Sequence, residues 1–519
     1  MRSPAQRTEL KSCAALNLIK PDKKECNQRK WHASNSSLFG HSRHPRTPRP
    51  GARLTSILKY QARAATCYCF DFIESLSTVA MLTDPGFASN STNHTVETAQ
   101  RLLREGRVAE AERAFLDVLA TQPEQVEALR FLAKAAMARG DIGAAIEWLN
   151  RTAAIDRNDI GVLMELGVAY RIADRFDASR YVFERALELS EGRNTTARLL
   201  LANVLELDER PELALIQYFR AILDAQRTGH WLDDNSTQEG IRLLVQHAMQ
   251  YVFEGRQAWF NGVLERFREE MPSAELGRID RALAIYLHDS NERPADPRQR
   301  PTMLYVPDLG AAPIIGLSRF DWLAACTTCI ATTSTEIDTC LALHDKPSVS
   351  AFNLGMVKDD EAVDSESVLS RVRRIAIYHH GIPLEGIRQQ APQLLAAMVN
   401  MPLVRIPQHS PDAEIIAIGP AMQASTPFGR SNSRCGIVIA LPGSAPIDIT
   451  IGGELHGLQE GEALVFDSSF GVEYSNGGDS EARLLASEIW HPDLTPFERE
   501  ALTALTIAIV DFDTKLEQA

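Results

Sequence analysis

The sequence predicts a multidomain α + β protein in which a helical solenoid is followed by a jelly-roll domain. Three observations lead to this prediction. A pattern of small and large side chains recurs every 34 residues in the first half of the chain, which indicates stacked helix pairs. Short β-branched runs between glycine-rich turns follow later, which indicates antiparallel strands. The segment NERPADPRQRP (291–301), dense in proline and charge, separates the two and reads as a linker.

The composition narrows the class of protein. A chain of 519 residues is too long for one hydrophobic core, so two or three domains are expected. The chain has 45% hydrophobic and 24% charged residues, as globular proteins do, and lacks any run of eighteen apolar residues. We therefore expect no membrane segment and a cytoplasmic location.

The first 80 residues differ from the rest in charge. They hold 14 Lys and Arg against 5 Asp and Glu, a net charge of +9. The whole chain has a net charge of −14, so residues 81–519 carry −23. An acidic body argues against nucleic-acid binding. Because residues 1–80 lack periodicity, we expect a disordered basic extension, which can lie upstream of a native start at Met81. An intact mass tests this expectation, and an Arg-rich targeting peptide is the alternative.

The repeat is defined by residues at fixed offsets from three openers. The openers are Gly106, Gly140 and Asp174, followed at +5 by Ala111, Ala145 and Ser179, at +9 by Phe115, Leu149 and Phe183, and at +12 by Val118, Thr152 and Ala186. A weaker fourth copy begins near Glu209, with Ala214, Tyr218 and Ala221. Three copies in register at four offsets disfavour an ordinary helical bundle with chance spacing, so we expect helix pairs over 95–226.

These repeats resemble tetratricopeptide repeats. The signature of the first helix is clearest in the third copy, with Leu166, Gly167 and Tyr170, and Pro123 closes the first copy. The small residues let two helices approach, and the large ones fill the space between repeats. The resemblance implies a solenoid whose concave face binds a protein or peptide.

The remaining segments complete the predicted organisation. Residues 227–290 continue the helical spacing and are expected to extend the solenoid. A jelly roll is expected over 302–505, with a tail at 506–519. Its predicted strands are 413–419, 435–441, 446–453, 462–467 and 483–490, whereas residues 302–410 show a mixed pattern.

Three motifs in the β-domain carry a second resemblance. They are Gly429-x-x-Asn432-x-Arg434, EGEALVFD (460–467) and WHPDLTP (490–496), accompanied by RPTMLYVPDL (300–309). The region 300–505 resembles the aspartyl/asparaginyl β-hydroxylase family of dioxygenases, in which tetratricopeptide repeats often precede the catalytic domain. The resemblance implies a double-stranded β-helix with Fe(II) and 2-oxoglutarate as cofactors.

The chain departs from this family at the iron ligands. The resemblance places the two ligating histidines at Pro427 and Val472, and a further histidine that helps hold the co-substrate at Val438. Proline and valine offer no ligand atom. A rebuilt site would require other histidines to converge on one ion. The candidates are His379, His380, His409, His456 and His491. We therefore predict no catalytic residue and no metal ligand.

Two arginines are the candidate cofactor-binding residues. The family captures the carboxylate of 2-oxoglutarate with an arginine on the strand before the WHP motif, and Arg483 is the candidate. It lies one residue nearer Trp490 than in relatives, a slip that turns a side chain to the opposite face unless a bulge restores it. Arg434 matches its motif and can bind an anion. The alternative for both is a solvated arginine at a strand end.

The cysteines give weaker signals. Cys326-x-x-Cys329 lies in an apolar, helix-like stretch. A lone pair of this kind is weak support for zinc. Ordinary half-buried thiols in a reducing cytoplasm are the favoured interpretation.

Three functions follow from these patterns. The first is a degenerate hydroxylase that binds a protein or peptide on the concave face of the repeats, with neither nucleic acid nor membrane as partner. The second is an active 2-oxoglutarate-dependent peptidyl Asp/Asn β-hydroxylase with an atypical metal site. The third is a scaffold whose jelly roll only caps the solenoid. Because both imidazoles are replaced and oxygen activation depends on the metal, we favour the first.

Overall fold

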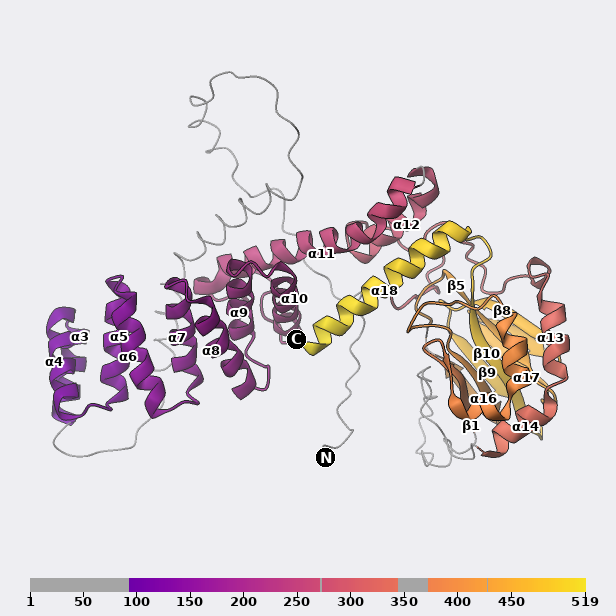
Figure 1. Ribbon diagram of the computed structural model, residues 1–519, viewed down its shortest axis with the longest axis horizontal. Helices are drawn as coiled ribbons and strands as arrows, with labels where there is room; N and C mark the ends of the chain where they lie inside the picture. Colours follow the sequence, from indigo (N-terminus) through magenta and orange to yellow (C-terminus); the bar gives the residue numbers. More distant parts are fainter. Residues whose placement is uncertain (1–92, 271–272, 344–371, 427) are drawn as a thin grey trace, which may run out of the picture. The chain divides into compact units, whose positions relative to one another are not determined.

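The computed structural model describes residues 93–270, 273–343, 372–426 and 428–519. The chain forms two compact units (Figure 1). The repeat unit contains the described residues up to Gln257 together with Thr514–Ala519, and the β-unit contains Ala258–Asp513. The predicted extension 1–80 lies outside the described residues, and the domain limits inferred from the sequence stay predictions.

The repeat unit is built from consecutive helix pairs, as the 34-residue period predicts (Figure 1). The pairs are α3 (Asn93–Arg104) with α4 (Val108–Thr121), α5 (Val126–Ala138) with α6 (Ile142–Ile155), α7 (Ile160–Ile172) with α8 (Phe176–Leu189), and α9 (Thr195–Leu207) with α10 (Pro211–Arg227). The short η3 (Glu239–Ile241) then leads into α11 (Arg242–Glu270). The predicted solenoid is therefore confirmed.

Each of the four residues that open the repeats lies in the turn between the two helices of a pair. Gly106, Gly140, Asp174 and Glu209 have φ values of 73°, 78°, 54° and 59°. At the third turn Arg175 N donates to Tyr170 O at 2.9 Å and Asp174 N donates to Arg171 O at 3.1 Å. This left-handed hydrogen-bonded ending is one of the common ways to terminate a helix. The period in the sequence is thus the period of these turns.

The residues at the predicted offsets fill the interior of the repeats. Those at +5 are fully buried, and those at +9 and +12 are at most 2% exposed. At Gly167 an added Cβ would lie 2.6 Å from the ring of Phe183, and Ser179 Oγ donates to Gly167 O at 2.7 Å. Helices α7 and α8 can approach this closely only because position 167 has no side chain.

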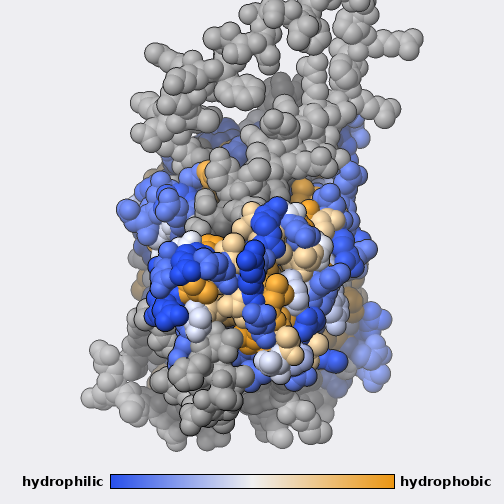
Figure 2. Space-filling view, turned by 90° about the vertical axis from the view of Figure 1, so that its left-hand side faces the viewer, coloured by the Kyte–Doolittle hydropathy of each residue, from blue (hydrophilic) through white to orange (hydrophobic). Residues whose placement is uncertain are grey.

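The surface at the start of the repeats is not uniformly polar. Figure 2 faces this end of the repeat unit and shows apolar side chains lying among hydrophilic ones. On α4, Val108 is 51% exposed and Leu116 is 44% exposed. The outer repeats of a solenoid usually present a polar face, so this end departs from that pattern.

The β-unit contains two antiparallel sheets. One has the order β2-β1-β3-β10-β5-β8 and the other β4-β9-β6-β7. The strands are β1 (Val372–His379), β2 (Ile382–Pro383), β3 (Ala413–Ile418), β4 (Met422–Thr426), β5 (Arg434–Ala440), β6 (Ile447–Ile451), β7 (Glu454–Leu458), β8 (Ala463–Asp467), β9 (Val472–Asn476) and β10 (Ala482–Trp490). All five predicted strands are present, and β1, β2, β4, β7 and β9 were not predicted. The interleaved order is that of a jelly roll.

The larger sheet is covered on both faces. Its inner face packs against the smaller sheet through Val438, Leu484 and Phe466, among others. Its outer face, with Ile437 and Leu485, packs against helices (Figure 1). These helices are α13 (Leu323–Ala331), α14 (Ser334–Leu343), α16 (Glu385–Gln390) and α17 (Pro392–Val399). Every residue of β3, β5 and β8 is buried for this reason.

The β-unit also contains residues 258–270 of α11 and three further helical segments. They are α12 (Ser273–Tyr286), η4 (Leu317–Arg319) and the larger part of α18 (Pro496–Gln518). Among the described residues, no helix combines the length and the apolar character that crossing a bilayer requires.

The left-handed conformation of Asp174, in the turn of the third repeat, allows a prediction about the stability of the repeat unit. A left-handed conformation costs an Asp more than a Gly, so Asp174→Gly should stabilise the repeat unit by about 0.5–1 kcal/mol. At Gly140 an added Cβ would meet nothing within 4 Å. Gly140→Ala is therefore the matched control and should destabilise through the backbone alone. Thermal unfolding measures both, and a lower midpoint for Asp174→Gly would contradict the argument.

Candidate functional site

The motifs of the β-unit meet at one end of the sandwich. Arg434 is the first residue of β5 and pairs with Trp490, the last residue of β10. An isolated bridge joins Leu304 to Ser431. The segments 300–309, 429–434 and 490–496, separated in the sequence, thus become neighbours at this end.

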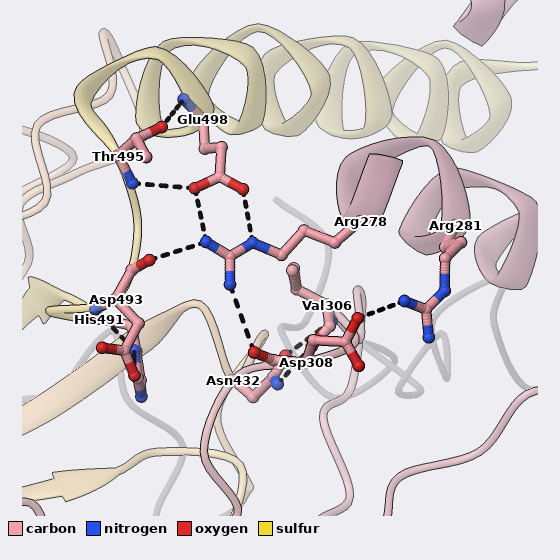
Figure 3. A network of polar contacts seen from close by, with 9 residues as sticks. All are labelled: Arg278, Arg281, Val306, Asp308, Asn432, His491, Asp493, Thr495 and Glu498. Atoms are coloured by element: carbon pink, nitrogen blue, oxygen red, sulfur yellow. Dashed lines mark hydrogen bonds and ion pairs between the residues drawn. The ribbon is translucent and has the colours of Figure 1, made fainter. Parts of the chain in front are cut away.

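Asn432 joins two of these segments through its carboxamide (Figure 3). Its Oδ1 accepts a hydrogen bond from Val306 N at 2.7 Å, and its Nδ2 donates to Val306 O at 2.8 Å. The side chain is fully buried. The asparagine of the motif therefore satisfies both backbone groups of a buried residue and has a structural role.

Arg278 of α12 lies at the centre of the same network (Figure 3). Its guanidinium donates to both carboxylate oxygens of Glu498, at 2.5 and 2.7 Å, and to the backbone oxygens of Asp493 and Asp308, at 2.7 and 3.3 Å. Glu498 also accepts from Thr495 N, while Glu498 N donates to Thr495 Oγ1, a capping box at the start of α18. Burial acts to raise the pKa of Glu498, but hydrogen bonds from Arg278 and Thr495 hold it below its usual value.

His491 of the WHP motif is a buried, neutral acceptor. Asp493 N donates to its Nδ1 at 3.2 Å, and His491 N donates to Ser433 O at 2.9 Å. Burial lowers the pKa of His491 to about 4, although Asp493 acts in the opposite direction. An imidazole that receives a backbone hydrogen bond in this way ties a turn.

Asp467, at the end of the EGEALVFD motif, also ties a turn. Its carboxylate accepts from Ser469 N at 2.8 Å and from Gln299 Nε2 at 2.7 Å. Burial raises the pKa of Asp467, and these hydrogen bonds oppose the rise. Its partner Gln299 lies in the predicted linker, so this linker packs onto the jelly roll.

Arg434 points to the inner face of the larger sheet. It is 2% exposed, and its Nη1 lies 3.3 Å from Glu488 Oε2 and 3.4 Å from Ser410 Oγ. Burial lowers the pKa of Arg434, and Glu488 opposes this shift. The side chain is thus a buried cation paired with one carboxylate.

Arg483 lies at the other end of β10 and on the other face. It is seven residues before Trp490, and an odd number of steps along a strand reverses the direction of the side chain. Its guanidinium bonds Asp338 of α14 at 2.8 Å and Glu481 at 3.2 Å. The structure does not bring Arg434 and Arg483 together, because no bulge interrupts the pairing of β10 with β5 or β3.

Val472 and Val438 stand where the resemblance places two of its three histidines. Val472 is the first residue of β9, pairs with Thr426 and Ile451, and is 3% exposed within the core between the sheets. Val438 of β5 lies in the same core. Pro427 lies outside the described residues. Apolar side chains therefore occupy the described positions where imidazoles would be needed.

A second buried ion pair lies between the sheets and was not predicted from the sequence. Arg374 of β1 and Glu414 of β3 lie 3.0 Å apart, and both side chains are at most 5% exposed. Glu414 stands within a predicted strand, but Arg374 lies in a segment that showed only a mixed pattern. If VRRIAIYH (372–379) had been recognised as a strand, the alternation of its side chains would have placed Arg374 and Ile375 on opposite faces of the sheet.

Two groups of potential metal ligands stand out in the part of the chain that the structure describes. His379, His380 and Asp412 offer ligand atoms that all lie within 4.8 Å of one another. Cys326 and Cys329 lie on α13, where Cys326 is buried and Cys329 is exposed. Burial raises the pKa of Cys326 to about 11, so its thiol is a poor metal ligand at neutral pH.

The helix pairs have a recognised sequence model. Residues 96–160 and 164–230 match the tetratricopeptide repeat. The curated proteins contain no match to this chain.

Solved structures resemble parts of the chain. Two crystal structures of MamA share 21% and 23% identity, cover 32% of this chain and 92% and 93% of theirs, and have TM-scores of 0.24 and 0.25. A cupin domain of an XRE-family transcriptional regulator from Enterobacter cloacae shares 15% identity, covers 15% of this chain and 81% of its own, and has a TM-score of 0.14.

The lowered pKa of His491 predicts that the stability of the β-unit depends on pH. The unfolded histidine has a pKa of about 6.5, whereas the folded one has a pKa of about 4. Between these two pH values the unfolded state binds a proton at this histidine and the folded state does not. The contribution of His491 to the free energy of unfolding is therefore fully present above pH about 6.5 and is lost as the pH falls toward about 4. The loss should be on the order of 3 kcal/mol for the β-unit.

The matched variant is His491→Asn, whose Oδ1 can accept from Asp493 N without titrating. Its unfolding free energy, measured by urea denaturation across this pH range, should decline less steeply than that of wild type. Equal slopes would show that His491 does not control this loss.

Proposed function

We propose that this protein binds a protein or peptide partner through its tetratricopeptide repeats, and that its β-unit is a degenerate member of the aspartyl/asparaginyl β-hydroxylase family. The observation that carries the first part is the repeat array itself, since such repeats generally mediate protein–protein binding. The proposal of a degenerate hydroxylase rests on the motifs in the β-unit and on Pro427 and Val472, which stand where the family has its iron-binding histidines.

The strand order supports the degenerate hydroxylase. Of the eight strands β3 to β10, four lie in the larger sheet (β3, β5, β8 and β10) and four in the smaller one (β4, β6, β7 and β9), the distribution of a double-stranded β-helix. Asn432, Asp467 and His491, all from the family motifs, make buried hydrogen bonds that hold this shell together. The motifs can therefore persist for stability after the chemistry is lost.

The packing around Val472 supports loss of iron binding. A ligand at this position would have to leave a core shared with Ile451 and Phe470. Arg483, the candidate for 2-oxoglutarate, points away from the space between the sheets and is engaged by Asp338 and Glu481. We therefore propose that the β-unit acts through its surface and not through the family's oxygen chemistry.

The partner is proposed to lie on the concave face. Polar contacts join the first helices of successive repeats: Gln100 of α3 donates to Glu127 of α5, Arg130 of α5 to Glu165 of α7, and Arg171 of α7 to Asn203 of α9. We propose that these first helices, which contact one another from repeat to repeat, line the concave face. A cytoplasmic location is proposed because the described cysteines carry free thiols.

Anaerobic calorimetry on the full chain tests the loss of hydroxylase chemistry. We expect no Fe(II) binding that 2-oxoglutarate tightens, and no conversion of 2-oxoglutarate to succinate. Saturable binding by wild type that 2-oxoglutarate strengthens would sink the degenerate interpretation.

Site-specific photo-crosslinking tests the binding face. A benzophenone amino acid in place of Glu127 on α5 should yield an adduct with the partner in cells expressing the full chain. The same group in place of Tyr181 on α8, which is 72% exposed, is the control and should yield little. An adduct from position 181 alone would move the binding surface to the second helices.

A further inference from the structure

We propose that His379, His380 and Asp412 form a binding site for a borderline divalent transition-metal ion such as Zn²⁺. The site lies between the β1–β2 turn and the segment that enters β3. It shares no residue with the positions that the hydroxylase family uses for iron, and it adds a function to the β-unit beyond partner binding.

The distances between the three side chains suit a shared ion. His379 Nδ1 lies 3.6 Å from Asp412 Oδ1, which is too far for a good hydrogen bond. Two ligands of a tetrahedral zinc, each about 2.0–2.1 Å from the metal, lie ~3.3 Å from each other. The rings of His379 and His380 have centroids 4.0 Å apart and planes inclined by 42°. Small side-chain rotations would therefore bring the three ligand atoms onto one ion.

The backbone brings two consecutive histidines to the same side. Neighbouring residues of a strand normally point to opposite faces. His379 ends β1, but His380 adopts a left-handed conformation with φ 50°, which redirects its side chain. Such a conformation is uncommon and strained in residues other than glycine. The chain thus tolerates strain at the point where the two imidazoles converge.

The turn is fixed against the segment that carries Asp412. Gly381 N donates to Pro411 O at 2.9 Å, and a Cβ at Gly381 would lie only 2.8 Å from Ser410 O. A glycine with φ 82° is therefore required for this close approach. The ligands from two segments 32 residues apart are consequently held in contact before any metal arrives.

Asp412 is oriented by hydrogen bonds that leave its charge available. His380 N donates to Asp412 Oδ1 at 2.8 Å, and Ser487 Oγ donates to Asp412 O at 2.9 Å. Such supporting bonds orient ligands in metal sites. The side chain of Asp412 is 16% exposed and that of His379 is 47% exposed, so water can reach the ion and complete its coordination.

The donor set decides the class of metal. Two neutral imidazoles and one carboxylate suit Zn²⁺ and neighbouring transition metals, whereas Ca²⁺ and Mg²⁺ prefer oxygen ligands throughout. Three protein ligands leave at least one coordination position for water or another ligand. If the cluster served only to hold the turn, the hydrogen bond from His380 N to Asp412 Oδ1 would be enough, and neither imidazole would be needed. Substituting an imidazole therefore distinguishes a metal site from a structural turn.

The experiment titrates the full chain with Zn²⁺ against a chromogenic chelator under reducing conditions. His379→Gln and Asp412→Asn should each bind one equivalent of Zn²⁺ fewer than wild type. Asp412→Asn keeps an oxygen that can accept from His380 N, so its turn should fold normally. The control is His456→Gln on β7, which removes a histidine outside the cluster and should bind as wild type does.

A second measurement ties binding to the folded β-unit. Zn²⁺ should raise the midpoint of thermal unfolding in wild type and in His456→Gln, because a ligand that binds only the native state stabilises it. It should not do so in the two cluster variants. If the cluster variants bind as many equivalents as wild type, or if wild type binds none, the proposal is overturned.

Adding 2-oxoglutarate separates this proposal from the proposed function. If metal binding depends on His379 and Asp412 and 2-oxoglutarate leaves its affinity unchanged, both proposals stand. If 2-oxoglutarate strengthens binding at these residues, the metal site stands and the degenerate interpretation fails. If binding is lost only in variants elsewhere in the chain, the metal site proposed at the β1–β2 turn fails.

Discussion

The pairing of β10 with its two neighbours is the constraint on which the β-unit depends. β10 lies between β3 and β5 with an uninterrupted register, so each of its residues is committed to one face. This register places Glu488 beside the buried Arg434, turns Arg483 outward, and brings the WHP segment against Ser433. A shift by one residue would exchange these sets and bury Arg483 among apolar side chains.

Much of the fold could be predicted because its signals are local. The left-handed turns set the period of the repeats. Four of the five recognised strands, β3, β5, β8 and β10, belong to the larger sheet, and they are largely apolar because both faces of that sheet are covered. The fifth, β6, lies in the smaller sheet and was recognised from its β-branched run. β4 and β9 belong to the smaller sheet and carry exposed or half-buried residues, so they lacked this signal. β1 was hidden because Arg373 and Arg374 interrupt its apolar pattern.

The candidate site was less predictable because it depends on long-range geometry. The motif spacing identified Arg434 and Arg483, but only the register shows that they lie on opposite faces. His379 and His380 lie before the first predicted strand, so the sequence did not indicate that their side chains converge. Their convergence depends on a left-handed residue, and their proximity to Asp412 depends on the tight packing of Gly381. Neither feature leaves a periodic trace in the sequence.

The edge strand beside this cluster has a consequence for association between molecules. β2 ends the larger sheet, pairs with β1 over only Tyr378↔Pro383 and His379↔Ile382, and includes a residue without an amide hydrogen. An incoming strand would find almost no ladder to extend there. The jelly roll can therefore expose this edge, and the histidines next to it, without inviting edge-to-edge polymerisation.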